Sequence, residues 1–209
     1  MQGSVDSAET LNYGTAVDSH SGHAEGHEAH PDHRIFGLIV FLGAESMIFL
    51  GLFMAYLTFR AVYPSWPPEG TPERELLVPG INTLILISSS FVIHKADVAI
   101  KKNDVAGLRT WFGLTAAMGA IFLLGQVYEY SNLEFGLKTN LYASSFYVLT
   151  GFHGLHVFLG LCLILGVLWR ARKREHYSEA HHFGVEAAEL YWHFVDVVWI
   201  ILFLLLYLL

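Results

Sequence analysis

Four ionisable side chains near the C-terminus follow one another at intervals of three, four and three residues: Glu186, Glu189, His193 and Asp196. This spacing places them in one stripe on a helix. The sequence around them, ELYWHFVDVVWIILFLLLYLL, is otherwise apolar enough to enter lipid. Carboxylate and imidazole groups in such a stripe can bind a metal ion, relay protons or hydrogen-bond to another helix. The remaining faces, with Val195 and Val198, are expected to meet lipid.

A pair of histidines, His153 and His156, lies three residues apart in the segment TGFHGLHVFLG. Gly151, Gly154 and Gly160 surround the pair and predict close approach by another helix, since small residues let backbones pack in lipid. Glutamate and histidine on one helix facing two histidines on another is an arrangement found in bundle metalloproteins. Haem ligation by opposed histidines and purely structural hydrogen bonds are the alternatives. Spacing alone leaves all of these open, and proton relay or transport as well.

Glu45 occurs in another apolar segment, FLGAESMIFLGLF. A charged side chain at the centre of a membrane helix costs roughly 2.5–3.5 kcal/mol, so such a group faces protein or water. Without a partner from another helix the carboxyl would be neutral. Glu45 is therefore a functional candidate, although a hydrogen-bonded neutral acid fits equally well. A further acid, Glu129, lies three residues after Gln126, near the end of its apolar segment.

The composition places the chain among integral membrane proteins, because 54% of its residues are hydrophobic, only 15% are charged and the mean hydropathy is +0.44. Crossing a bilayer takes roughly 20 helical residues. Long apolar runs without the alternation of strands argue against a barrel. We predict an all-α integral membrane bundle of five transmembrane helices, at residues 35–60, 79–100, 109–131, 141–169 and 185–209.

Residues 1–34 have no periodic apolar pattern and are predicted to form a mobile tail that precedes the membrane domain at 35–209. The tail is rich in histidines that could bind a transition metal, but nothing fixes the geometry of a specific site. These histidines are His20, His23, His27, His30 and His33. Neither a signal peptide nor a transit peptide is recognisable in this segment.

Charge and cysteine usage narrow the function further. A formal net charge of -7 without a basic patch argues against nucleic acid as a partner. Cys162 is the only cysteine, which excludes an internal disulfide and cysteine-based metal sites.

Lysine and arginine are distributed unevenly between the loops on the two sides of the predicted membrane domain. The richer side receives Arg34, Lys101, Lys102, Arg109, Arg170, Arg172, Lys173 and Arg174, and the poorer side receives Arg60, Arg74 and Lys138. Because positive charge stays on the cytoplasmic side, we expect a cytoplasmic N-terminus and a C-terminus on the opposite face.

Four segments together resemble subunit III of haem-copper cytochrome c oxidase. They are FLGAESMIFLGLF, PGINTLILISSS, TGFHGLHVFLG and HHFGVEAAELYWHFVDVVWI, in the order and spacing of that family. The resemblance covers residues 35–209 and is to the short, five-span bacterial form. Longer members have seven spans, and this sequence corresponds to their third span onward.

The resemblance implies that this chain carries no haem, no copper and no other metal, the haem and copper being in partner subunits. Its polar residues then form a structural network within the bundle: Glu129, His153, His156, Glu186, Glu189, His193 and Asp196. Glu45 matches a buried carboxyl of the family. Arg170, Lys173 and His176 match positions that contact phospholipid headgroups, and a cation cluster at a cytoplasmic interface suits an anionic lipid.

The implied function is that of a non-catalytic subunit of a proton-pumping oxidase that passes electrons from cytochrome c to oxygen. The chain would pack on subunit I, in a complex with subunit II, bind phospholipid and support proton uptake and stability. Its location would be a bacterial inner membrane or an internal respiratory membrane. Three histidines at the cytoplasmic face, His176, His181 and His182, could feed protons, since imidazole changes charge near neutral pH.

Two other functions remain as alternatives. Subunit III of a quinol oxidase shares the five-span layout, although Glu45 favours the cytochrome c type. A small-solute transporter would also place ionisable residues in the membrane. Repeat symmetry and broken helices, which are typical of transporters, are not visible in the sequence.

Overall fold

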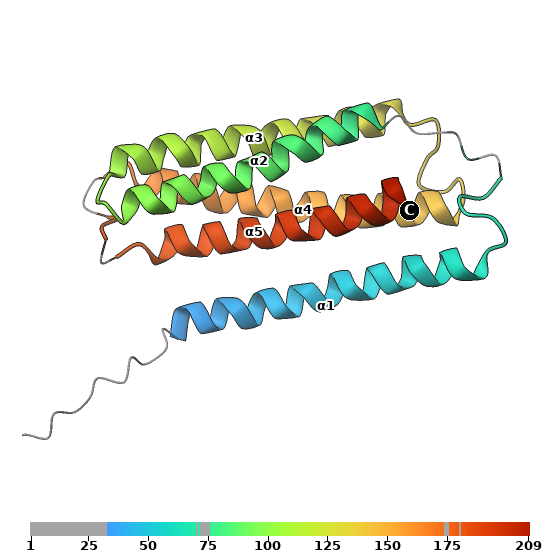
Figure 1. Cartoon of the computed structure of the whole chain (residues 1–209), viewed down its shortest axis with the longest axis horizontal. Helices are drawn as coiled ribbons and strands as arrows, with labels where there is room; N and C mark the ends of the chain where they lie inside the picture. Colours follow the sequence, from blue (N-terminus) through green and yellow to red (C-terminus); the bar gives the residue numbers. More distant parts are fainter. Residues whose placement is uncertain (1–32, 70, 72–75, 174–175, 180) are drawn as a thin grey trace, which may run out of the picture. The chain divides into compact units, whose positions relative to one another are not determined.

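The computed structural model describes residues 33–69, 71, 76–173, 176–179 and 181–209, and most of the predicted tail lies outside these residues. The described residues form five helices that are long and apolar enough to cross a membrane (Figure 1). This confirms the predicted all-α fold. The helices are α1 (His33–Val62), α2 (Leu77–Ile100), α3 (Val105–Asn132), α4 (Leu141–Arg170) and α5 (Phe183–Phe203), which continues into the π-helical turn η1 (Leu204–Leu208).

Polar residues in the loops determine where two of the helices begin. The side chain of Asp104 accepts a hydrogen bond of 2.9 Å from the amide of Gly107, and Asn140 accepts one of 2.7 Å from Ala143. Each satisfies a backbone donor that has no partner within the helix. Because Asp104 caps α3, this helix starts four residues before the predicted span. At α2 the helix also begins earlier, since Pro79 is tolerated in a first turn.

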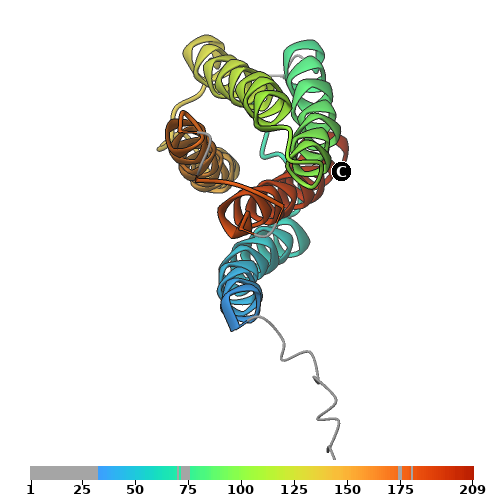
Figure 2. The same ribbon diagram turned by 90° about the vertical axis from the view of Figure 1, so that its left-hand side faces the viewer.

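Helix α5 is the most deeply buried of the five and contacts α1, α2 and α4 (Figure 2). Trp192 and Trp199 are almost fully enclosed, as are Val195 and Val198. The expectation that the two valines meet lipid is therefore wrong. Neighbouring helices lie against several sides of α5, so its apolar side chains are covered as well as its polar stripe.

The indole of Trp192 fits where α3 and α4 carry glycine. A Cβ at Gly119 would lie 2.5 Å from Trp192 Cη2, and one at Gly160 would lie 3.0 Å from Cε3. Gly160 therefore allows the close approach predicted for its segment. At Gly151 and Gly154 no other helix comes as near, since the closest side-chain atom is the Tyr130 hydroxyl, 3.7 Å from a Cβ at Gly151.

Helix α1 contributes least to the core, with 11% of its most apolar window buried. It contacts α4 and α5 through an inward row of buried side chains: Leu42, Phe49, Phe53 and Tyr56. Its other faces expose large apolar side chains, among them Ile39, Val40, Met47, Leu50 and Met54. An apolar face of this size belongs against lipid or another membrane helix.

Candidate functional site

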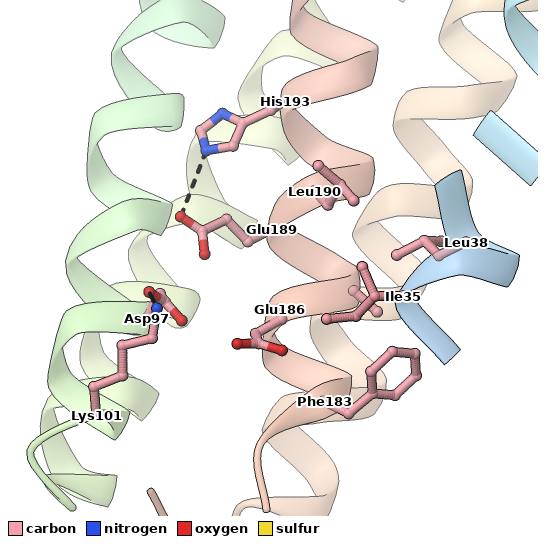
Figure 3. Close-up of a pocket in the computed structure, with 10 residues that line it drawn as sticks. Ile35, Leu38, Asp97, Lys101, Phe183, Glu186, Glu189, Leu190 and His193 are labelled. Atoms are coloured by element: carbon pink, nitrogen blue, oxygen red, sulfur yellow. Dashed lines mark ion pairs between the residues drawn. The ribbon is translucent and has the colours of Figure 1, made fainter. Parts of the chain in front are cut away.

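A row of polar contacts joins α2 to α5. His94 Nδ1 of α2 lies 2.9 Å from Glu189 Oε1. His193 Nε2, one turn further along α5, lies 3.5 Å from the same oxygen, as Figure 3 shows. The Glu189 side chain is only 13% exposed, so it depends on these imidazoles for charge compensation. Two predicted stripe residues, Glu189 and His193, thus contact each other, and Glu189 also pairs with His94, which was not among the predicted site residues.

Ser90 of α2 extends this row toward the middle of the bundle. Its hydroxyl lies 3.0 Å from His193 Nδ1 and donates a hydrogen bond to Asp196 Oδ2. Both ring nitrogens of His193 therefore contact polar groups, one on each side. Asp196 is nearly fully buried. The row alternates carboxylate, imidazole, hydroxyl and carboxylate, which holds two membrane helices together and gives each acid at least one partner.

The row ends near Asp97, a buried acid in the last turn of α2. Asp97 Oδ2 lies 2.6 Å from the Nζ atom of Lys101, the residue that comes directly after α2. This hydrogen bond raises the pKa of Lys101. Glu186, the first residue of the predicted stripe, pairs instead with His182 at 3.2 Å, one turn earlier in the chain. The polar residues of α2 at this contact also follow one another at helical spacing, four and three residues apart: Ser90, His94 and Asp97. This spacing could have identified them from the sequence.

Glu45 of α1 contacts His156 of α4, with 3.2 Å between Oε2 and Nε2. The other ring nitrogen, Nδ1, lies 2.8 Å from the backbone oxygen of Phe152. Because a carbonyl oxygen only accepts, Nδ1 carries a proton, and a second proton is shared between His156 and Glu45. The His156 side chain is 6% exposed, and the rings of Phe49 and Phe152 flank it. The partner required for Glu45 at membrane depth is therefore on α4.

Removing either member of the Glu45–His156 pair should weaken the attachment of α1. We expect Glu45→Leu and His156→Leu to be non-additive, with a coupling free energy of about 0.5–1.7 kcal/mol. The measurement is a double-mutant cycle on the free energy of unfolding in mixed micelles. A cycle of Glu45→Leu with His176→Leu, an exposed loop histidine, should give no coupling. Additive losses for the first cycle would show that the contact contributes nothing.

Two predicted network residues lie apart from these rows. His153 is fully buried beside Trp199 and Phe122, with ring centroids 4.8 and 5.9 Å away, and neither of its nitrogens has a hydrogen-bond partner among the described residues. Glu129 lies near the C-terminal end of α3 and accepts hydrogen bonds from Tyr207 at 2.8 Å and Gln126 at 3.2 Å. The predicted polar residues therefore form several separate contacts.

The three predicted lipid-contacting residues, Arg170, Lys173 and His176, are all exposed where α4 ends. Arg109 of α3 holds this segment by donating hydrogen bonds of 2.8 and 2.6 Å to the Ala171 carbonyl. A further bond of 2.8 Å reaches the carbonyl of Arg172. Arg170 and Lys173 thus project from a backbone that is fixed against α3.

Among the described residues, two groups have ligand atoms close enough to share a metal ion: His94, Asp97 and Glu189, and Asp97, His182 and Glu186. Neither group includes His153 or His156. The polar stripe of α5 meets α2, whereas the α4 histidines contact α1 and an aromatic cluster. The geometry therefore does not bring the stripe and the α4 histidines together in one ligand set.

Five long apolar helices with ionisable groups paired between them define a multi-pass, helical membrane protein. The family model for cytochrome c oxidase subunit III matches residues 18–209. The chain belongs to this family and is thus a subunit of a respiratory oxidoreductase complex, which confirms the resemblance.

Curated relatives agree with this assignment along most of the chain. A protein of Synechocystis sp. named cytochrome c oxidase subunit 3 is 71% identical over 188 residues, covering 90% of this chain and 81% of the relative. One of the same name from Thermostichus vulcanus is 63% identical over 209 residues, covering 100% and 98%. One from Strongylocentrotus purpuratus is 39% identical over 180 residues, covering 82% and 68%.

Proposed function

We propose that the chain is the accessory third subunit of a proton-pumping cytochrome c oxidase and carries no redox centre of its own. The observation that carries this proposal is the pairing of its membrane carboxyls with imidazoles and hydroxyls of neighbouring helices, as at Glu45–His156 and Glu189–His94. Side chains that form ion pairs or hydrogen bonds with each other link neighbouring helices. Haem and copper then belong to partner subunits, and cytochrome c is the donor that the names of the relatives favour over quinol.

The contact with catalytic subunit I is assigned to the exposed apolar faces of α1. These faces carry large side chains along the length of the helix, and they are the part of the bundle that its own helices cover least. Phospholipid binding is assigned to the end of α4. Arg170 and Lys173 offer cationic groups there and His176 an imidazole, beside an apolar helix, which suits an anionic headgroup.

The orientation follows from the distribution of basic residues. With residue 33 on the cytoplasmic side, five crossings bring the C-terminus to the other face. The ends of α2 and α4 and the beginning of α5 are then cytoplasmic, in a bacterial inner membrane or an internal respiratory membrane.

The proposal is tested by comparing the oxidase with and without this chain. The complex lacking it should keep its haem spectrum and its initial rate of cytochrome c oxidation, but should lose activity after fewer turnovers. Adding the purified chain back with phospholipid should restore the number of turnovers. Loss of a haem band together with the chain would contradict the assignment of all redox centres to partner subunits.

The cytoplasmic histidines provide a second test, of the role in proton uptake. His176 and His181 are exposed, and His182 is half-buried against Glu186. Replacing all three with glutamine should slow proton uptake in the assembled oxidase, and a high concentration of small buffer should restore the rate. Stopped-flow measurements with a pH indicator follow the uptake. Unchanged uptake at low buffer concentration would reject the role.

A further inference from the structure

Three potential ligands from two helices meet at the cytoplasmic end of the α2–α5 contact. His94 and Asp97 lie three residues apart on α2, and Glu189 faces them from α5. One ligand atom from each lies within 4.8 Å of the others. One imidazole nitrogen with two carboxylate oxygens is a donor set that suits a divalent transition metal, zinc above all.

A second observation points to a cation at the same place. The Asp97 side chain is only 4% exposed, and its Oδ1 has no hydrogen-bond partner among the described residues, whereas Oδ2 is paired with Lys101. A buried carboxylate oxygen without a partner is costly, and a bound cation would remove that cost. Asp97 and Glu189 both line one cavity of about 250 Å³, which has room for an ion with water (Figure 3).

One pair of the three ligand atoms is already near the separation that an ion requires. Zinc bound to a nitrogen and an oxygen at about 2.0–2.2 Å each, with tetrahedral angles, separates the two donors by about 3.4 Å. His94 Nδ1 and Glu189 Oε1 are now 2.9 Å apart, so they must separate by about half an ångström. His193 Nε2, 3.5 Å from the same glutamate oxygen, is a further potential donor. The His94 side chain is 64% exposed, which gives an ion access to the site.

We propose that His94, Asp97 and Glu189 form a binding site for a divalent transition-metal ion such as Zn²⁺, with Lys101 competing for Asp97. The proposal does not depend on the proposed function, because it concerns only contacts within the chain. It also differs from the expectation, drawn from the family resemblance, that the chain binds no metal. A bound ion would link α2 to α5 and stabilise the folded bundle in proportion to its occupancy.

The experiment uses the full-length chain in detergent micelles, with Zn²⁺ alone as the probe. All variants also carry His20→Ala, His23→Ala, His27→Ala and His30→Ala, which lowers zinc binding by the N-terminal segment. Equilibrium dialysis followed by elemental analysis should find one zinc per chain at this site. His94→Gln and Glu189→Gln should each weaken the binding by about tenfold or more. His182→Gln is the demanding control and should leave it unchanged.

If the His94→Gln variant loses its helical circular dichroism signal, a variant with a higher affinity for zinc provides the second test. Lys101→Met removes the cation 2.6 Å from Asp97 and should tighten zinc binding roughly tenfold. Lys102→Met, the exposed neighbour, should have no effect. The proposal is overturned if zinc binds equally to all variants or to none. It is also overturned if His182→Gln abolishes binding and His94→Gln does not.

Discussion

Replacing Trp192 with alanine is expected to lower the free energy of unfolding by about 3–5 kcal/mol, the usual cost of removing a large buried aromatic side chain. The indole is fully buried on α5 and fills the space left by Gly119 and Gly160. Its Nε1 donates a hydrogen bond of 2.8 Å to Ser89, whose hydroxyl also donates to the Leu86 carbonyl. Ser89 would keep one partner, so most of the loss comes from the cavity.

The loss at Trp192 is measured by unfolding in mixed micelles, followed by circular dichroism. Trp169→Ala is the matched control, because that indole is 70% exposed at the end of α4. Its removal should change the free energy of unfolding by no more than about 0.5 kcal/mol. Similar losses at the two positions would contradict the central placement of α5.

Arg109→Leu is expected to lower the free energy of unfolding by about 1.5–3 kcal/mol, the cost of losing hydrogen bonds made by a charged group. The guanidinium binds the carbonyls of Ala171 and Arg172, where α4 ends and its carbonyl groups lack helical partners. Arg109→Lys should lose less, because lysine keeps the charge but lacks the forked donor geometry.

Arg109 also fixes the backbone from which Arg170 and Lys173 project. The Arg109→Leu oxidase should therefore retain less phospholipid, which is measured as phosphorus per complex after purification. Arg172→Leu, at an exposed position, is the control for stability and should cost about 0.5 kcal/mol or less. If Arg109→Leu behaves like this control, the hydrogen bonds to the end of α4 are not important.

Much of the fold could be predicted from the sequence, because each apolar segment is long enough to span lipid and polar loops separate the segments. The ends were less predictable. Asp104 caps α3 before its apolar segment begins, and Pro79 lies within the first turn of α2. These local hydrogen-bonding and backbone effects are not visible in hydropathy.

The candidate site was predictable within one helix but not between helices. Spacing correctly placed Glu189, His193 and Asp196 near one another on α5, but not their partners Ser90 and His94 on α2. Which helices touch depends on the packing of all five together. The same limitation explains the error at Val195, because the number of neighbours around a helix cannot be read from that helix alone.

The most direct test of the central claim is an absorption spectrum taken before and after this chain is separated from its complex. A tagged chain purified from respiratory membranes in mild detergent should bring with it a reduced-minus-oxidised haem spectrum and the ability to oxidise cytochrome c. After dissociation the isolated chain should be colourless, and the haem should remain with the partner subunits. Haem retained by the isolated chain would contradict an accessory subunit built from mutually paired side chains.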